Sequence, residues 1–459
     1  MKKLYTLVFL LLSTIVLESC NDFVELEAPK TQIVSASVFE NDAGARAAVS
    51  GIFSQMMNVS SFASGGSNGI TVITGLSGDE LNNHSTSQNQ IALYTNNLTS
   101  LNSAAVSSNW NDMYSTIYQS NAVLEGTQGS GGLTPKIKDQ VIGEAKFIRA
   151  FSYFYLINLY GDVPLVTTTD YRVNRVASRT PVSDVYTQIE ADLVDAQKLL
   201  LEDYSYSLGE KTEPNKWAAT ALLSRTYLYR QKWTEAEAQA RSIIDSEIFS
   251  LESDLNSVFL MNSTEAIWQL MPVIPGVNTS DAPYLIIASN PTRVSVSTAV
   301  TDIFEPADQR ATSWIGTYTS SGKSYNYAFK YKVRLRDEPV TEYNMIFRLA
   351  EQYLIRAEAR ANLNNLAGAL EDVNVIRVRA GLDPIDATGL TQQQVLDVID
   401  HERRPELFVE WGHRWFDLKR SGKIDAVLGS AKADWQSKDA MFPIPQAEIN
   451  ANPNLIQNP

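Results

Sequence analysis

Apolar residues recur at three- and four-residue spacing along most of the chain, a pattern typical of amphipathic helices. The clearest example is the segment 139–160, whose apolar face consists of Val141, Ala145, Ile148, Tyr155 and Leu159. Three phenylalanines at positions 147, 151 and 154 widen this face, so we expect a helix that other elements contact from two sides. Gly161 and Pro164 then end it.

The same periodicity predicts further helices over residues 39–57, 104–125, 215–231, 234–246, 343–363, 366–380 and 391–411. Gly126 is the expected stop of the second of these. Another helix is expected to open at Thr180-Pro181, an N-cap followed by proline at the first helical position, and to run to about residue 202.

Two helix pairs have the spacing of tetratricopeptide-type hairpins, which place small residues where antiparallel helices approach. The first pair covers 221–244, with Leu223, Ser224, Tyr227, Ala236, Ala240 and Ile243 at the repeat positions. The second covers 353–376, with Tyr353, Ala357, Ala369, Val373 and Ile376. The alternative is two unrelated hairpins. Stacks of such repeats commonly present a surface to a protein partner.

Two regions interrupt the helical pattern. Residues 58–103 are rich in Ser, Asn, Gly and Thr, which predicts long loops. Residues 251–339 mix short strand-like runs, at 266–270, 284–288 and 325–333, with Pro and Gly turns. Loops of this length in a compact domain are usually functional or disordered.

The second region also concentrates aromatic residues, whose flat faces dock onto the apolar faces of sugar rings and of other amphipathic ligands. The residues predicted to stack on a ligand are Tyr284, Trp314, Tyr318, Tyr325 and Tyr327. Polar partners for ligand hydroxyls are expected in the first region, at Asp79, Asn82, Asn83 and His84. The alternative is that the aromatic residues fill a small core.

The N-terminus has the features of a secretory signal. Lys2 and Lys3 precede the apolar run 4–17, which is shorter than the roughly 20 residues of a membrane-spanning helix. Leu17, Ser19 and Cys20 fit a lipobox, although Glu18 departs from it. We predict a signal peptide over 1–19, lipid attachment at Cys20 and an acidic tether over 20–30. An ordinary signal peptide with a stray thiol is the alternative.

The composition excludes several classes of function. The 459 residues carry a net charge of −14, which disfavours binding of nucleic acids because that binding depends on Lys and Arg. One cysteine rules out an intrachain disulfide framework, and three histidines leave little material for histidine-based catalysis. We expect no cofactor, and the sequence does not indicate whether a metal ion binds.

Catalytic motifs do not fit. The segment 316–324 resembles a phosphate loop but has five residues between its glycines where four are needed. His401-Glu402 begins like a zinc-protease motif, yet Pro405 stands where the second histidine belongs. Asp79 and Glu80 are the nearest candidates for paired carboxylates of a glycoside hydrolase. We therefore expect no enzyme, with a lipid-anchored glycoside hydrolase as the rival from another class.

Several segments together resemble the SusD/RagB family of outer-membrane nutrient-binding lipoproteins of Bacteroidota. These segments are 144–150, 160–165, 348–359, 374–382, 402–407, 412–420, 442–445 and 452–459, the last without the family's usual final Gly-Tyr. The resemblance extends over nearly the whole chain. Its motifs belong to the scaffold, so they carry over no ligand contacts.

The resemblance implies a mainly α fold, a tetratricopeptide-like helical scaffold with a large loop-rich ligand-binding insert. The implied SusD-like domain covers 31–459, with its scaffold over about 31–57, 104–250 and 340–425. The ligand-binding parts cover about 58–103 and 251–339, and a tail covers 426–459.

The resemblance also implies a surface-exposed lipoprotein that captures oligosaccharides and delivers them to a TonB-dependent (SusC-like) transporter in the outer membrane. A peptide-binding subunit of the same kind of importer is one alternative. A repeat scaffold without any small ligand is another.

Overall fold

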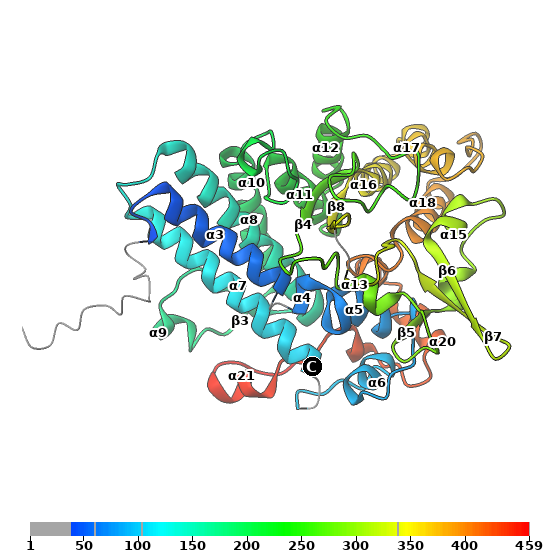
Figure 1. Cartoon of the computed structure of the whole chain (residues 1–459), viewed down its shortest axis with the longest axis horizontal. Helices are drawn as coiled ribbons and strands as arrows, with labels where there is room; N and C mark the ends of the chain where they lie inside the picture. Colours follow the sequence, from blue (N-terminus) through cyan, green and yellow to red (C-terminus); the bar gives the residue numbers. More distant parts are fainter. Residues whose placement is uncertain (1–37, 59–60, 102–103, 337–338, 459) are drawn as a thin grey trace, which may run out of the picture.

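A computed structural model describes residues 38–58, 61–101, 104–336 and 339–458. The predicted signal peptide, Cys20 and the tether lie outside these residues. The fold is mainly α-helical, which confirms the predicted class (Figure 1). The long helices are α3 (Asp42–Asn58), α7 (Ala104–Gln128), α8 (Pro135–Tyr160), α10 (Val182–Leu199), α11 (Lys216–Tyr229), α12 (Trp233–Ile244), α16 (Leu349–Asn362), α17 (Leu366–Arg379) and α18 (Gln392–Leu407).

The scaffold is a stack in which neighbouring helices pack in the order α7, α8, α10, α11, α12, α16, with α17 and α18 both packed on α16. The two predicted repeat hairpins are α11–α12 and α16–α17. Between α12 and α16, the small residues Ala236, Ala240 and Ala359 are fully buried in one cluster. Small residues at this crossing allow the helix backbones to approach closely, and two of them, Ala236 and Ala240, stand at predicted repeat positions.

Helix α8 is buried on two sides, as its apolar face predicts. The rings of Phe147 and Phe151 lie 4.9 and 5.3 Å from the ring of Trp268, which is fully buried in strand β4 (Ala266–Leu270). Gly161 ends the helix with a φ of 74°, a conformation that favours glycine.

Several predicted boundaries differ from the structure; the helix predicted over 391–411, for example, ends at Leu407. Helix α7 continues through Gly126, which is a glycine because a Cβ there would lie 2.2 Å from the ring of Phe39. Pro181 is itself the N-cap of α10. The helix predicted over 343–363 divides into strand β8 (Asn344–Arg348) and α16, because β8 pairs with β4 in an antiparallel ladder.

The region 58–103 consists mainly of short helices, so the prediction of long loops is wrong. Its elements are α4 (Ser61–Ser64), the 3₁₀ helix η2 (Gly66–Asn68), α5 (Ile70–Ser77), β1 (Leu81–Asn83) and α6 (Gln88–Tyr94). Every residue of α5 is buried. The Thr74 hydroxyl donates to the Ile70 carbonyl at 2.6 Å, which shows how a polar sequence satisfies its hydroxyl inside a core.

The region 251–339 alternates short helices and strands. Strand β4 has its predicted bounds, but the run 284–288 is not a strand, since α13 (Asp281–Leu285) ends within it. The further elements are β5 (Val294–Val296), α14 (Thr298–Thr301), α15 (Gln309–Trp314), β6 (Ile315–Ser320) and β7 (Lys323–Ala328). Strand β7 thus begins before the predicted run 325–333 and ends inside it.

Among the described residues the strands form four antiparallel pairs, β1–β5, β2–β3, β4–β8 and β6–β7. The β6–β7 hairpin projects at the end of the molecule opposite to α3, α7 and α8 (Figure 1). The remaining elements are β2 (Val163–Pro164), α9 (Tyr171–Asn174), β3 (Arg179–Thr180), the 3₁₀ helix η3 (Ser205–Ser207), α19 (His413–Arg420), α20 (Ile424–Ala431), the 3₁₀ helix η4 (Ser437–Ala440) and α21 (Gln446–Ala451).

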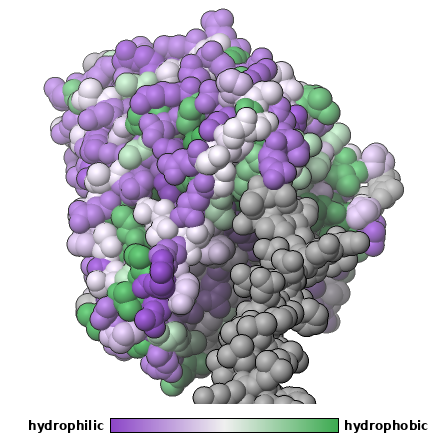
Figure 2. Space-filling model, turned by 90° about the vertical axis from the view of Figure 1, so that its left-hand side faces the viewer, coloured by the Kyte–Doolittle hydropathy of each residue, from purple (hydrophilic) through white to green (hydrophobic). Residues whose placement is uncertain are grey.

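The C-terminal segment returns to the scaffold, where the Phe442 amide donates to the Leu159 carbonyl at 2.8 Å. The end of the molecule formed by α3, α7 and α8 has a mainly hydrophilic surface with small separate hydrophobic groups (Figure 2). No helix in the described part of the chain is long and apolar enough to cross a membrane.

Candidate functional site

Three of the predicted stacking residues share one face of the β6–β7 hairpin. Tyr318 lies directly opposite Tyr325, and Tyr327 lies opposite Gly316. Directly opposed residues of an antiparallel pair point to the same side, and so do residues two apart on one strand. The three tyrosines are partly exposed. They therefore form an aromatic surface, which we call the tyrosine face.

The geometry of the hairpin fixes this face. Ser321 and Gly322 at the turn have φ values of 51° and 76°, the signs that a tight hairpin turn requires. The ring of Tyr327 lies over Gly316, where a Cβ would approach it to 2.2 Å. The opposite face is polar, with Thr317 donating to Asn326 at 2.8 Å. Aromatic and polar side chains are thus separated between the two faces.

The first region meets the tyrosine face through His84. Its ring lies edge-on to Tyr325, with 5.5 Å between the ring centroids. The His84 amide donates to the Arg293 carbonyl at 2.7 Å, and its Nε2 lies 2.8 Å from the Ser295 hydroxyl. Burial lowers the pKa of His84, so the imidazole is neutral at neutral pH. Residues of the regions 58–103 and 251–339 therefore meet at one surface.

Tyr284 lies next to Arg293, whose backbone carbonyl accepts from the His84 amide. The guanidinium of Arg293 lies 5.4 Å from its ring centroid, a cation–π distance. Beside them lies an open hollow of about 420 Å³ that Asn290, Thr292 and Arg334 also line. The Nε of Arg334 is buried and has no hydrogen-bond partner in the described part of the chain. Aromatic, amide, hydroxyl and guanidinium groups therefore surround one hollow.

The other predicted polar residues are partly engaged. Asp79 forms a bidentate ion pair with Arg414, at 3.0 and 2.7 Å, and its side chain is only 6% exposed. The prediction that Asp79 contacts a ligand is therefore wrong for this conformation. The Asn82 amide donates to the Val296 carbonyl at 3.2 Å, and Asn83 exchanges hydrogen bonds with the backbone of Ser85. Both asparagines remain partly exposed.

Trp314 belongs to the core. Its side chain is fully buried, its indole N–H donates to the Leu255 carbonyl at 2.9 Å, and its ring meets Phe259 edge-on. The prediction that Trp314 stacks on a ligand is therefore wrong. Its backbone carbonyl accepts from Phe329 at 2.8 Å, which closes the base of the hairpin. Trp314 thus holds the tyrosine face without lying on it.

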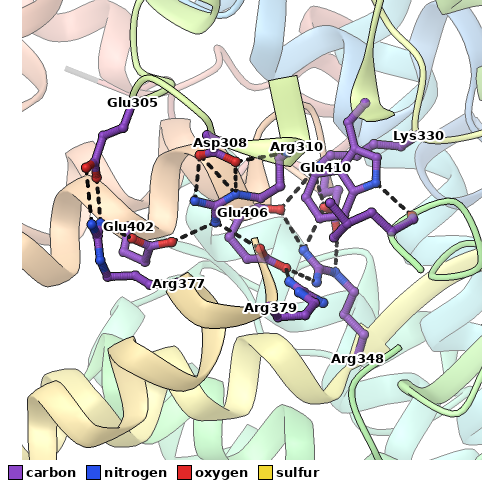
Figure 3. A network of polar contacts seen from close by, with 12 residues as sticks. Glu305, Asp308, Arg310, Lys330, Arg348, Arg377, Arg379, Glu402, Glu406 and Glu410 are labelled. Carbon is purple, nitrogen blue, oxygen red and sulfur yellow. Dashed lines mark hydrogen bonds and ion pairs between the residues drawn. The ribbon is translucent and has the colours of Figure 1, made fainter. Parts of the chain in front are cut away.

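A buried network of charges holds both ends of the hairpin (Figure 3). Just before β6, Arg310 pairs with Glu402 at 2.7 Å and with Glu406 at 3.1 Å. Just after β7, Lys330 donates to the Glu406 carbonyl at 2.9 Å and pairs with Glu410. Both ends are therefore tied to the end of α18.

Glu406 is the centre of this network, which we call the Glu406 hub. Arg348 and Arg379 each approach its carboxylate to 2.5 Å, in addition to Arg310. Burial by itself would raise the pKa of Glu406, but the three guanidiniums hold it well below its usual value. The Glu406 carboxylate is therefore ionised at neutral pH. Through its three arginine partners the network connects α15, β8, α17 and α18.

Sequence reasoning missed Arg293 and Arg334. Arg293 lies in the turn-rich run Asn290-Pro291-Thr292-Arg293 immediately before β5. Such a run marks an exposed loop, where an arginine is a candidate ligand contact. Within the described residues, no group of three His, Cys, Asp or Glu side chains is arranged to hold a metal ion.

Comparison with known proteins identifies the family. A family model described as starch-binding and associating with the outer membrane matches residues 41–228, and a model of the SusD family matches residues 200–459. The second match alone covers more than half of the chain. The chain therefore belongs to the SusD family.

Relatives and solved structures agree with this. SusD-like protein P25 of Formosa agariphila is 26% identical, over 96% of this chain and 95% of its own. The starch-binding protein SusD of Bacteroides thetaiotaomicron is 23% identical, over 74% of this chain and 76% of its own. A laminarin binding SusD-like protein superposes with a TM-score of 0.78 at 22% identity, over 91% of this chain and 99% of that chain. That likeness shows the same fold.

Proposed function

We propose that this protein captures oligosaccharides on the surface formed by Tyr284, Tyr318, Tyr325 and Tyr327. The observation that carries the proposal is the tyrosine face, whose three rings are partly exposed and whose Tyr325 ring lies beside His84. Pyranose rings have apolar faces that stack on such rings. Asn82, Asn83, His84 and Arg293 are the proposed partners of sugar hydroxyls. Two similar proteins, the starch-binding protein SusD and the laminarin binding SusD-like protein, are named for a glycan, which supports a glycan as the ligand.

We further propose that the protein is an outer-membrane lipoprotein, anchored through Cys20 and facing outward. It would deliver its ligand to a TonB-dependent transporter and carry out no chemistry itself. The lipobox supports the anchor, and the family description supports association with the outer membrane. The names of relatives describe binding proteins. Replacing Cys20 with Ser should remove the chain from the outer-membrane fraction, and a variant that still reaches the outer membrane would refute the anchor.

Titration calorimetry with maltoheptaose and laminarihexaose tests the binding surface. We expect Tyr325→Ala to weaken binding of the preferred oligosaccharide about tenfold, since stacking of one ring contributes about 1 kcal/mol beyond its buried area. Thr317→Ala is the matched control, because Thr317 lies on the polar face of the same hairpin. Equal weakening by both variants would refute the tyrosine face. Binding of peptides in place of sugars would refute a glycan as the ligand, but it would leave the proposed role in ligand capture unchanged.

Catalysis is tested in the same samples. The lengths of the oligosaccharides should remain unchanged after prolonged incubation with the protein. Shortened products that disappear with a carboxylate variant such as Glu80→Gln would favour the rival hydrolase.

A further inference from the structure

A second hollow lies on the helical scaffold. It opens between α16 and α18 and measures about 690 Å³ when the solvent space at its mouth is included. Its lining includes Gln231, Trp233, Glu358, Asn362, Gln393 and Leu396. These residues come from α12, α16, α18 and the turn before α12, none of which carries a residue of the tyrosine face. We call this hollow the scaffold groove.

Helical spacing makes the walls of the groove continuous. Gln393, Leu396 and Asp400 lie three and four residues apart, so they form one stripe along α18. Glu358 and Asn362 form a matching stripe on α16. Because α16 packs on α18, the two stripes face a common space.

The floor of the groove carries strong hydrogen-bonding groups whose charges are balanced. Arg420 donates to Glu358 at 2.7 Å and to Asp417 at 2.7 Å, and all three side chains are 11–13% exposed. At the rim, Lys423 pairs with Asp400 at 2.9 Å. Since each carboxylate already has a cationic partner, the groove does not select a ligand of net charge. Its carboxylate oxygens and guanidinium N–H groups can still bind neutral hydroxyls.

Trp233 supplies the apolar wall. The side chain is partly exposed at the start of α12 and lines the groove. The side-chain amides of Gln231, Asn362 and Gln393 line the same groove. An indole face, neutral amides and balanced ion pairs together fit a ligand with one flat apolar face and a rim of hydroxyl groups.

We propose that the scaffold groove is a second saccharide site, in which one neutral pyranose stacks on Trp233. The Glu358–Arg420 pair and the amides of Asn362 and Gln393 bind its hydroxyls. This site is independent of the tyrosine face. A long glycan that occupies both sites gains avidity, because the second contact forms at a high effective concentration.

The test follows Trp233 directly in the full mature chain. The chain has eight tryptophans, so 5-fluorotryptophan labelling gives a resolvable ¹⁹F spectrum in which Trp233→Phe identifies one signal. Maltoheptaose and laminarihexaose are titrated to about 10 mM, a range that detects weak sites. We expect at least one of them to shift the Trp233 signal, both in the wild type and in Tyr325→Ala. If neither moves the signal in either protein, the second site is refuted, whatever happens at the tyrosine face.

Binding variants complete the test. In the Tyr325→Ala background, Trp233→Ala should weaken the remaining binding at least about fivefold, and Trp233→Phe should retain most of it. Trp233 also packs against the buried cluster of α12 and α16, so the exposed Gln393→Ala provides a second variant that leaves this packing intact. We expect Gln393→Ala to weaken binding about threefold. Unchanged affinity in both Trp233→Ala and Gln393→Ala would overturn the proposal, and so would a shift caused only by peptides.

Discussion

Two parts of the β6–β7 hairpin differ in the exposure of their side chains: the base, around Trp314 and Lys330, and the blade, the two strands that carry Tyr318 and Tyr325. At the base, Trp314 and Lys330 are 0% and 4% exposed and fixed by specific partners. On the blade, Tyr318 and Tyr325 are partly exposed and oppose each other across two strands. The difference indicates a division of labour, in which the base sets the position of the hairpin and the blade presents the rings. The predictions below separate stability at the base from affinity on the blade.

Removal of the carboxylate of the Glu406 hub should have the largest effect. Glu406→Ala leaves three buried guanidiniums without their shared partner, and a broken buried ion pair typically costs about 3–5 kcal/mol. We expect the free energy of unfolding, measured by chemical denaturation, to fall by an amount at the upper end of this range. Tyr318→Ala, on the blade, should cost less than about 1.5 kcal/mol. Similar losses for the two variants would contradict the division of labour.

Trp314→Ala should come next. It removes a fully buried indole, and aromatic-to-alanine changes in cores cost about 3–5 kcal/mol. Its effect on ligand affinity, measured where the variant is still folded, should be smaller than that of Tyr325→Ala. A Trp314→Ala protein of normal stability that no longer binds oligosaccharide would indicate that Trp314 contacts the ligand.

Glu80→Gln should stabilise the protein, in a way that depends on pH. Burial raises the pKa of Glu80 to about 7, while the Val409 amide donates to its Oε1 at 3.0 Å. Between about pH 4.5 and 7 the unfolded chain ionises at this position and the folded chain does not, so the native glutamate loses stability as pH rises. We expect a gain of about 1–3 kcal/mol at pH 8 and little change at pH 4.5. Equal gains in stability at both pH values would show that the raised pKa of Glu80 is not their cause.

Gly316→Ala should have the smallest effect. The new methyl group displaces the ring of Tyr327, because the Cβ would lie 2.2 Å from it. We expect affinity for the preferred oligosaccharide to fall about threefold, with a stability change below about 1 kcal/mol. A larger loss of stability than of affinity would show that Tyr327 serves packing.

The sequence predicts the scaffold well because its helices bury periodic apolar faces, as α8 does. The prediction from sequence is wrong at α5, where Thr74 can be buried because its hydroxyl donates to a carbonyl of its own helix. It also fails at Asp79, whose partner Arg414 lies far away in the chain. Aromatic content correctly indicates the region of the hairpin, but it does not distinguish Trp314 from Tyr325. That distinction depends on tertiary partners such as Leu255, which single-sequence patterns do not contain.

The strongest test is a crystal structure of the mature chain with bound maltoheptaose or laminarihexaose. We expect a pyranose ring stacked on the tyrosine face and an unchanged Glu406 hub. An oligosaccharide seated elsewhere, with Tyr318, Tyr325 and Tyr327 free of contact, would contradict it.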